Sequence, residues 1–183
     1  MQGPTRYASQ EILRDGTTVT VRAARTDDGP RIDRAFHKLE RDTIYTRFFG
    51  YKADISEVEL SRITGADFDH AVALLVTVGA GEGEMVVGGA SYFVVNNATP
   101  FRSAEIAFLI EEDYQGRGLA SALLRHMIAI AHAKGLDQFE ADVLARNVPM
   151  LRVFRQSGLP MTLRREGDVV HVLLFLKGAS SEG

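Results

Sequence analysis

The sequence has no cysteine among its 183 residues. That absence excludes disulfide frameworks, thiolate metal sites and a cysteine nucleophile. No apolar run approaches the ~18 residues that a membrane-spanning helix requires, and residues 1–6 lack the basic and then apolar order of a signal peptide. A formal net charge of -3 supplies no basic excess for a nucleic-acid backbone. We therefore expect a cytoplasmic protein that has neither a membrane nor a nucleic acid as its partner.

What the chain does contain is ordinary globular composition, with 45% hydrophobic and 25% charged residues. A chain of this length fits one domain, because domains usually have ~100–200 residues. No internal repeat and no linker rich in proline, serine or glycine divides it. We expect a loose N-terminal segment at 1–10, a single domain at 11–177 and a flexible tail at 178–183.

Hydrophobic periodicity and turn residues predict the secondary structure. One helix is expected after a cap at Thr26 or Asp27. Further helices are expected at 42–49, 56–65, 118–133 and 147–156. Strands are expected at 17–22, 71–78, 85–95, 104–110, 139–144, 161–165 and 169–176. Because helices interrupt the strands and hairpins also occur, the order predicts an α/β (mixed α+β) fold, with one mixed sheet and helices on its faces.

The segment that follows the strand at 104–110 predicts a phosphate site. This apolar strand runs into a glycine-containing loop that opens the long helix. Gly116 and Gly118 let backbone N–H groups crowd together in the loop, and the helix N-terminus adds its partial positive charge. Together these features favour the binding of an anion such as phosphate.

Three known phosphate-binding loops can be compared with this segment. The Walker loop needs Gly-Lys followed by Ser or Thr, which the segment lacks. The dinucleotide fingerprint needs Gly or Ala where Ser121 stands, and its acidic residue would be Asp137, at the start rather than the end of a strand. The third pattern, Gln-x-x-Gly-x-Ala, is satisfied by Gln115, Gly118 and Ala120.

This third pattern resembles the pyrophosphate loop of the GNAT superfamily of acetyl-CoA-dependent N-acetyltransferases. The resemblance extends over roughly residues 12–176, because the order of the elements is also similar to the GNAT order. Within the superfamily, the chain looks most like the GNAT domain of bacterial Pat-type protein-lysine acetyltransferases. Four segments carry that closer resemblance: Tyr-Thr-Arg-Phe-Phe at 45–49, Asp-Phe-Asp-His at 67–70, Ala-Glu-Ile-Ala at 104–107 and Asn-Val-Pro-Met at 147–150.

The resemblance implies a central mixed, mostly antiparallel sheet of six to seven strands, with helices on both faces and a splay between the motif strand and the next. It also implies acetyl-CoA as cosubstrate and no metal; the five histidines show no metal-ligand spacing. Backbone N–H groups of the loop would hold the pyrophosphate, the freed strand end would pair with the pantetheine and polarise the thioester carbonyl, and Asn147 would bond the pantetheine from the other side. The implied acetyl-CoA-binding residues are Phe108, Leu109, Ile110, Gln115, Gly116, Arg117, Gly118, Leu119, Ala120, Ser121 and Asn147.

Glu105 is the candidate general base. An amine attacks only when it is deprotonated, and a lysine has a pKa of ~10.4 in water. Glu105 is the one charge in an otherwise apolar strand, where a carboxyl group is expected to have a raised pKa. It also matches the position of the catalytic Glu in Pat-type enzymes. The alternative is that Glu105 faces solvent or pairs with an arginine.

The general acid and the acceptor are less defined. Many GNAT enzymes have a Tyr on the last helix to protonate the thiolate, but this sequence has Phe154 there, as Pat-type enzymes often also lack the Tyr. Residues 45–49 stand where variable GNAT helices shape the acceptor site, although core packing is the alternative for Phe48 and Phe49.

The implied reaction is direct attack of a primary amine in a ternary complex, because no cysteine can carry an acetyl group. The acceptor is a protein lysine in the Pat-type reading. A polyamine, aminoglycoside or amino acid is the alternative, and so is a non-catalytic CoA-binding regulatory module. A homodimer also stays open.

Overall fold

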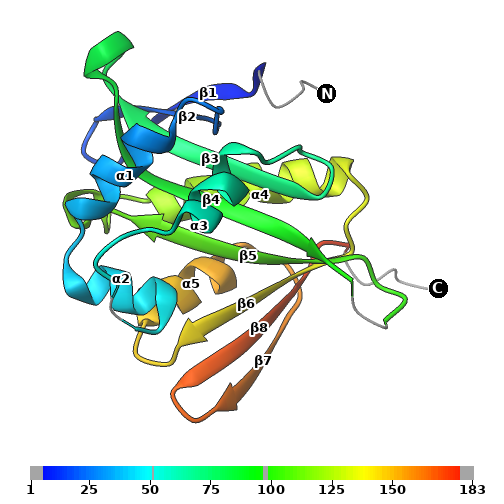
Figure 1. The fold of residues 1–183 in the computed structure, drawn as a ribbon. Coiled ribbons are helices and arrows are strands. Elements are labelled where there is room, and N and C mark those ends of the chain that lie inside the picture. The colour runs from blue at the N-terminus through cyan, green and yellow to red at the C-terminus, as the bar shows by residue number, and fades with distance from the viewer. Residues whose placement is uncertain (1–5, 51, 97–98, 178–183) are drawn as a thin grey trace.

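The computed structural model describes residues 6–50, 52–96 and 99–177. Within them, eight strands form one sheet (Figure 1). The strands are β1 (Ala8–Ile12), β2 (Thr18–Ala23), β3 (Ala71–Val78), β4 (Met85–Val95), β5 (Ser103–Ile110), β6 (Gln138–Leu144), β7 (Met161–Glu166) and β8 (Val169–Phe175).

Five α-helices occur in the same residues, each close to an expected range. They are α1 (Gly29–His37), α2 (Arg41–Phe48), α3 (Glu57–Thr64), α4 (Leu119–Ala133) and α5 (Val148–Gln156). The N-cap of α1 is Asp28 and not Thr26 or Asp27, so the predicted cap was wrong and the helix begins slightly later in the chain. The start of α3 follows local chemistry, because Ser56 Oγ accepts from Glu59 N at 3.1 Å and Glu59 Oε2 accepts from Ser56 N at 3.0 Å.

The sheet order is β1-β2-β3-β4-β5-β6-β8-β7, and β5 with β6 is the parallel pair among antiparallel ones. The mixed, mostly antiparallel sheet is therefore confirmed, but it has one strand more than the six to seven expected. The extra strand is β1, which lies partly in the segment predicted to be loose. Ala8 pairs with Arg22 and Ile12 with Thr18, and the tail predicted at 178–183 lies outside the described residues.

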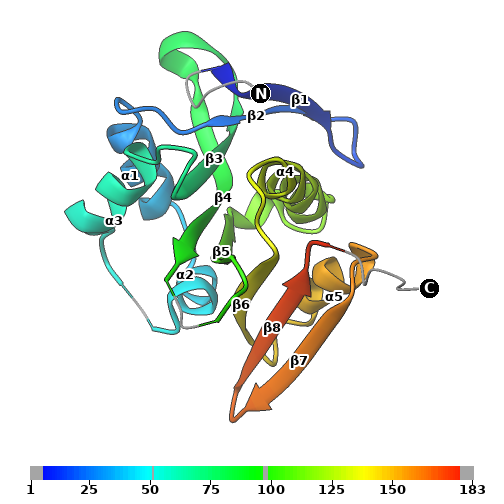
Figure 2. The same ribbon diagram turned by 90° about the vertical axis from the view of Figure 1, so that its right-hand side faces the viewer.

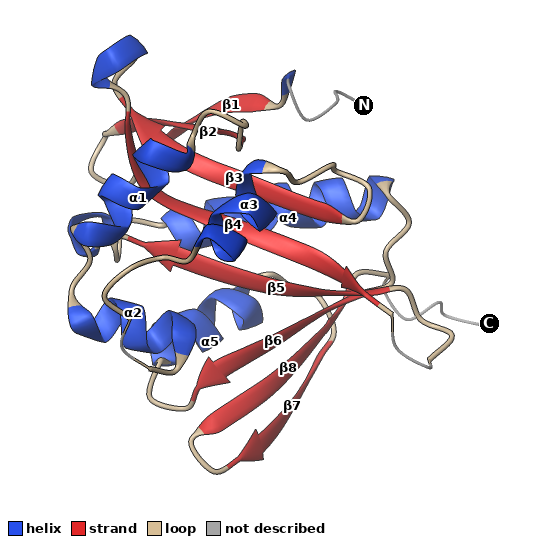
Figure 3. Ribbon diagram, in the orientation of Figure 1, coloured by secondary structure: helices blue, strands red, loops and turns tan. Residues whose placement is uncertain are grey.

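The expected splay separates β5 from β6. Their pairing runs from Ser103 with Gln138 to Glu105 with Glu140 and then stops. Beyond Glu105, β5 continues to pair with β4 as far as Ile110, while β6 continues along β8 as far as Leu144. Figure 3 shows the two strands diverging. The sheet therefore opens into a fork at Glu105.

Helices cover both faces of the first part of the sheet, which gives two apolar cores. Val72, Leu74 and Val76 of β3 pack with α4 and α5 residues in one core. Ala73 and Leu75 of the same strand pack with α1 and α2 residues in the other. A strand buried on both faces reads as a continuous apolar run, which is why β3 was recognisable from its sequence.

The last part of the sheet is covered on one face. Along β8, Val170, Val172 and Leu174 belong to the core beneath α4 and α5. The β7 residues Arg164 and Glu166, which pair with β8 from the hairpin, are 73% and 69% exposed. Figure 2 shows α5 against one side of these strands. This open face begins where the fork begins.

Candidate active site

The fork frees one residue of β5 in particular. Alternate residues of an antiparallel strand direct their N–H and C=O groups to the same neighbour. Glu111 N donates to Val87 O on the β4 side. Leu109, two residues earlier, pairs with Gly89 and directs its backbone groups to β4 in the same way. Phe108, one residue away, therefore directs its N–H and C=O toward β6, which has already diverged. These two groups are left for a ligand.

Ile110 shares the orientation of Phe108, but its carbonyl is used inside the protein. Gln115 Nε2 donates to Ile110 O at 2.9 Å and lies 3.3 Å from Thr43 Oγ1 of α2. The Gln115 amide therefore shapes the loop after β5 and ties it to α2. A part of Gln115 in acetyl-CoA binding would therefore be indirect, through the position of the loop.

The loop at 116–118 has the backbone that a phosphate site needs. Gly116 and Gly118 have φ of +74° and +88°, a region that costs other residues steric strain. Gly118 is the N-cap of α4 and has no side chain with which to cap it. The N–H groups of the first turn are therefore free to meet an anion such as a phosphate.

Arginines surround this loop. Arg14 N donates to Arg117 O at 3.2 Å, and the Arg117 guanidinium pairs with Asp15 at 2.6 Å. A cleft of about 240 Å³ beside the helix start is lined by Arg14, Arg117, Ser121 and Arg125, among others. Glu11 also lines the cleft and pairs with Arg125 at 3.6 Å, so carboxylates balance part of the positive charge next to the helix N-terminus.

Asn147 stands on the other side of the fork, after β6. Its Oδ1 accepts from Met150 N at 3.3 Å, so Asn147 is the side-chain cap of α5. The cap was one of the two roles expected for this residue. The Nδ2 group has two further hydrogens to donate, which suits the second role, a bond to the pantetheine.

Glu105 lies at the last paired position before the fork. Its neighbours Ala104 and Ile106 are buried, but Glu105 itself is exposed. The alternative that Glu105 faces solvent is therefore the one found. Strand alternation directs Glu105 away from α4.

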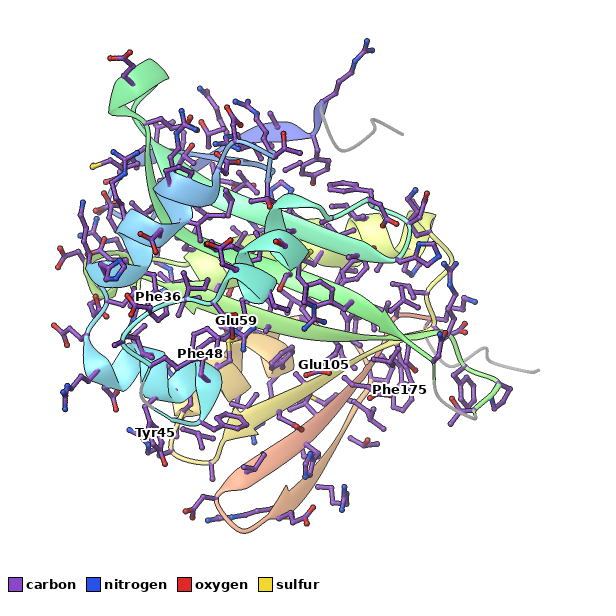
Figure 4. The ribbon with its side chains drawn as sticks, viewed as in Figure 1. Phe36, Tyr45, Phe48, Glu59, Glu105 and Phe175 are labelled. Carbon is purple, nitrogen blue, oxygen red and sulfur yellow. The ribbon has the colours of Figure 1, made fainter. Side chains whose placement is uncertain are left out.

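Glu105 faces a group of charges on α2 and α3. Burial lowers the pKa of the Arg47 guanidinium, while attraction to Glu59 and Glu105 acts in the opposite sense. Figure 4 shows Glu59 and Phe48 on the same side of β5 as Glu105. Arg47 and Lys52 each lie 4.7 Å from the centre of the Phe48 ring, so cation–π contacts hold this side of the fork.

Phe154 confirms that α5 supplies no hydroxyl here. Its ring is 1% exposed and packs edge-on against Phe108 at 6.0 Å. Phe108 and Phe154 therefore close the α5 side of the fork with apolar contact. Protonation of a leaving thiolate would have to come from water or from another group.

Sequence reasoning missed how α2 connects the two sides of the fork. Asp42 accepts from Arg146 at 2.9 Å, next to Asn147, while Thr43 meets Gln115 on the opposite side. Of the aromatic residues expected to shape the acceptor site, Tyr45 is exposed and Phe48 packs against Phe36 with ring centres 6.1 Å apart. No sequence pattern predicts the Asp42–Arg146 pair, because its partners are far apart along the chain.

Other features of the described residues are simpler. They contain no group of three or more His, Asp or Glu side chains that could hold a metal ion. No helix among them is long and apolar enough to cross a membrane. His70 is exposed and bonds Asp67, so it belongs to the turn before β3.

Comparisons with known proteins agree with this geometry. The model of the acetyltransferase (GNAT) family matches residues 36–159. Over 140 residues the chain is 30% identical to acetyltransferase PA5475 of Pseudomonas aeruginosa, covering 76% of this chain and 74% of that protein. It is 29% identical over 121 residues to acetyltransferase Pat of Mycolicibacterium smegmatis, covering 66% of this chain but 35% of the relative.

Solved structures extend the similarity to the fold. The GNAT domain of S. lividans PAT superposes with a TM-score of 0.83 at 32% identity, over 95% of this chain and 99% of that one. The yncA protein of Salmonella typhimurium, solved with its cofactor acetyl-CoA, shares the fold with a TM-score of 0.64 at 17% identity, over 90% of this chain and 98% of that one. The forked sheet, the glycine loop at the start of α4 and these matches lead to one conclusion: the chain belongs to the GNAT family of acetyltransferases, enzymes that use acetyl-CoA.

Proposed function

We propose that the protein transfers the acetyl group of acetyl-CoA to a primary amine by direct attack in a ternary complex, with Glu105 as the general base. One observation carries the proposal: an exposed carboxylate stands at the fork, three residues before the free backbone groups of Phe108 on the same strand. Glu105 and the loop at the start of α4 belong to opposite faces of the sheet. Donor and acceptor can therefore approach the fork from different sides.

The residues of the fork divide the chemistry between them. In this proposal the Phe108 N–H donates to the thioester carbonyl oxygen as negative charge develops, and one such donor is worth roughly 2.7–4 kcal/mol of barrier. Glu105 takes the proton of the attacking amine, directly or through one water. The new C–N bond forms as the C–S bond breaks, and water protonates the departing thiolate because Phe154 has no hydroxyl.

A Glu105→Gln variant tests this assignment. The amide cannot take the proton, so turnover should fall by ~10²–10⁴-fold. The affinity for acetyl-CoA should stay within about twofold, because the loop at α4 is unchanged. Steady-state kinetics and calorimetric titration of acetyl-CoA measure the two effects.

Glu82→Gln is the control, since Glu82 is an exposed glutamate in the turn between β3 and β4, away from the fork. Its turnover should stay close to that of the unmodified protein. Full activity in Glu105→Gln would contradict the general-base role. Loss of acetyl-CoA binding in that variant would show that Glu105 supports the structure of the site and is not its base.

We further propose a protein lysine as the acceptor. The similarity to the GNAT domain of S. lividans PAT supports this choice, together with the resemblance to Pat-type protein-lysine acetyltransferases. The exposed face of β6, β8 and β7 also supports it. Asp142, Arg164 and Glu166 give that face accessible polar groups at 50–73% exposure, and a polypeptide can lie across such a surface.

A further inference from the structure

An apolar cavity of about 100 Å³ lies on the Glu105 side of the sheet. Its roof is formed by α1, α2 and α3, and its floor by β3, β4 and β5. The residues that line it from the helices include Ile32, Ala35, Phe36, Leu39, Phe48 and Ile63. Nearly all of the lining is aliphatic or aromatic, with Arg47 and Glu111 as its charged members. A space of this size is large enough for several heavy atoms.

Small side chains in the floor create the cavity. Ala73, Ser91 and Ala107 pair across three neighbouring strands, so one row of the floor has only short side chains. In the next row, Gly89 lies between Leu75 and Leu109. A Cβ on Gly89 would approach the Leu74 carbonyl oxygen to 2.6 Å. The neighbouring backbone therefore excludes any side chain at this position, and the cavity keeps the space that a side chain would fill.

The cavity adjoins the fork. Ala107 follows Glu105 on the same face of β5, and the cavity lining continues from Ala107 through Phe108 to Leu109. Phe108 is the residue whose free N–H is proposed to meet the thioester carbonyl. A chain that extends from that carbonyl on the Glu105 side therefore meets the apolar floor.

We infer that this cavity binds the acyl chain of the donor, and that the protein uses uncharged short-chain acyl-CoAs such as propionyl-CoA and butyryl-CoA as well as acetyl-CoA. The inference rests on the proposed function, because it places the thioester at Phe108. A methyl group would leave most of the space empty, and the walls would lose their dispersion contacts. An acyl carboxylate is disfavoured, since the space is apolar apart from Ser91, Arg47 and Glu111, and a charged group that enters it loses its water.

Binding and turnover across an acyl series test the inference. Calorimetric titration without acceptor should show affinity rising roughly fourfold for each added CH₂ from acetyl to butyryl, the factor that corresponds to ~0.8 kcal/mol per buried CH₂. The ratio of kcat/KM for butyryl-CoA to that for acetyl-CoA should be correspondingly high with one fixed amine. Succinyl-CoA should be the poorer donor.

Filling the cavity should remove the preference. Ala35→Leu on α1 enters it from the roof, and Ser91→Val enters it from the floor. In either variant the butyryl-to-acetyl ratio should fall by at least about tenfold, for both affinity and kcat/KM, while acetyl-CoA is retained. Ala129→Leu, on the exposed side of α4, makes the same helical change elsewhere and should leave the ratio unaltered.

The outcomes separate this inference from the proposed function. Equal affinity for acetyl- and butyryl-CoA, or a ratio unchanged by both filling variants, would overturn the acyl assignment and leave the transferase standing. If the filling variants raised the KM for the amine acceptor and left the butyryl-to-acetyl ratio unchanged, the cavity would bind the acceptor and not the acyl chain. A preference for succinyl-CoA would refute the uncharged class. Chain-length-dependent binding without turnover would contradict the proposed function alone.

Discussion

Single residues at the start of α4 and α5 combine a structural and a ligand role. Gly118 is the N-cap of α4 at φ +88°, and a Cβ there would lie 3.4 Å from Arg14 Nε. Asn147 is the N-cap of α5 and keeps amide hydrogens free. Gly118 orients the backbone N–H donors of the first turn of α4, and Asn147 supplies a side-chain amide donor at the fork. Variants at these residues can therefore separate folding from binding.

Gly118→Val should lower the affinity for acetyl-CoA by at least tenfold. A branched side chain at positive φ costs roughly 1–2 kcal/mol and shifts the N–H groups that would meet the pyrophosphate. Gly167→Val is the control, because Gly167 also has positive φ, at +60°, but lies in the β7–β8 turn with open space around it. Titration of acetyl-CoA into both folded variants measures the difference. Equal affinities would place the pyrophosphate elsewhere.

Asn147→Asp should keep the cap and lose the ligand bond. Asp caps helices as well as Asn does, so the melting temperature should stay unchanged, while Asn147→Ala should lose about 2–4 °C. Without Nδ2 hydrogens, acetyl-CoA affinity should fall about 3- to 10-fold, the range of one hydrogen bond. Melting and titration of both variants give the two readouts. Unaltered affinity in Asn147→Asp would leave this residue as a cap alone.

At the scale of elements, a buried ion pair fixes α1 to the sheet. Asp28, fully buried at the start of α1, accepts from both terminal nitrogens of Arg22 on β2 at 2.8 Å. Arg22 Nε also bonds Glu84, next to the start of β4, at 2.8 Å. The three residues join β2, α1 and the β3–β4 hairpin. Because α1 roofs the cavity, this network also holds the cavity's shape.

Asp28→Asn should lower the free energy of unfolding by ~1–3 kcal/mol, since it removes one of the two carboxylates that bond Arg22 in the core and leaves Glu84 as the remaining one. Asp27→Asn, at an exposed neighbour that is 73% accessible, should change it by less than about 0.5 kcal/mol. Urea denaturation at neutral pH measures both. A small effect for Asp28→Asn would show that the pair does not hold α1.

The same pair predicts an acid dependence. Burial raises the pKa of Asp28, but the hydrogen bonds from Arg22 and from Arg25 N outweigh it and leave the pKa below its usual value. The stabilisation is therefore present above the unfolded pKa of ~3.9 and is lost as the pH falls through the lower folded value. The stability difference between Asp28→Asn and the unmodified protein should shrink below about pH 4.

At the scale of the whole molecule, the proposed function has the pyrophosphate of acetyl-CoA and the acceptor approach from opposite faces of one sheet. The glycine loop belongs to the α4 face, while Glu105 and the cavity belong to the face of α1 to α3. Toward β7, Arg164 and Glu166 of this second face are 73% and 69% exposed, and no helix of the described residues covers them. An open approach to the base fits a polypeptide acceptor better than an enclosed pocket does.

A panel of acceptors at matched amine concentration should show this preference. We expect acetyl transfer to a lysine-containing protein to exceed transfer to spermidine, an aminoglycoside or a free amino acid by at least tenfold in kcat/KM. Release of CoA and mass of the modified protein give independent readouts. Efficient transfer to a small amine with none to any protein would overturn the lysine proposal. Tight CoA binding without any transfer would favour a regulatory module.

The sequence alone determined the features that depend on near neighbours along the chain. The periodicity of α4, the continuous apolar run of β3 and the glycine pattern at 115–120 each lie within one segment. The signals themselves, which are a helical period, an unbroken apolar run and glycines that permit positive φ, are equally local. Glu105 could be singled out in the same way, as one charge in an apolar strand. The fold class and the position of the loop followed from these signals.

Tertiary structure alone decided where those segments meet. β1 is too polar to be recognised, and it exists because β2 offers a register partner for each of its residues. Glu105 is exposed although its strand neighbours Ala104 and Ile106 are buried, because its side chain points to the opposite face of the sheet from theirs. The side chain of Gln115 is directed to Ile110 and Thr43, and small residues of three strands align beneath α1 to form a cavity. Each outcome depends on contacts between residues distant in sequence, which no local pattern encodes.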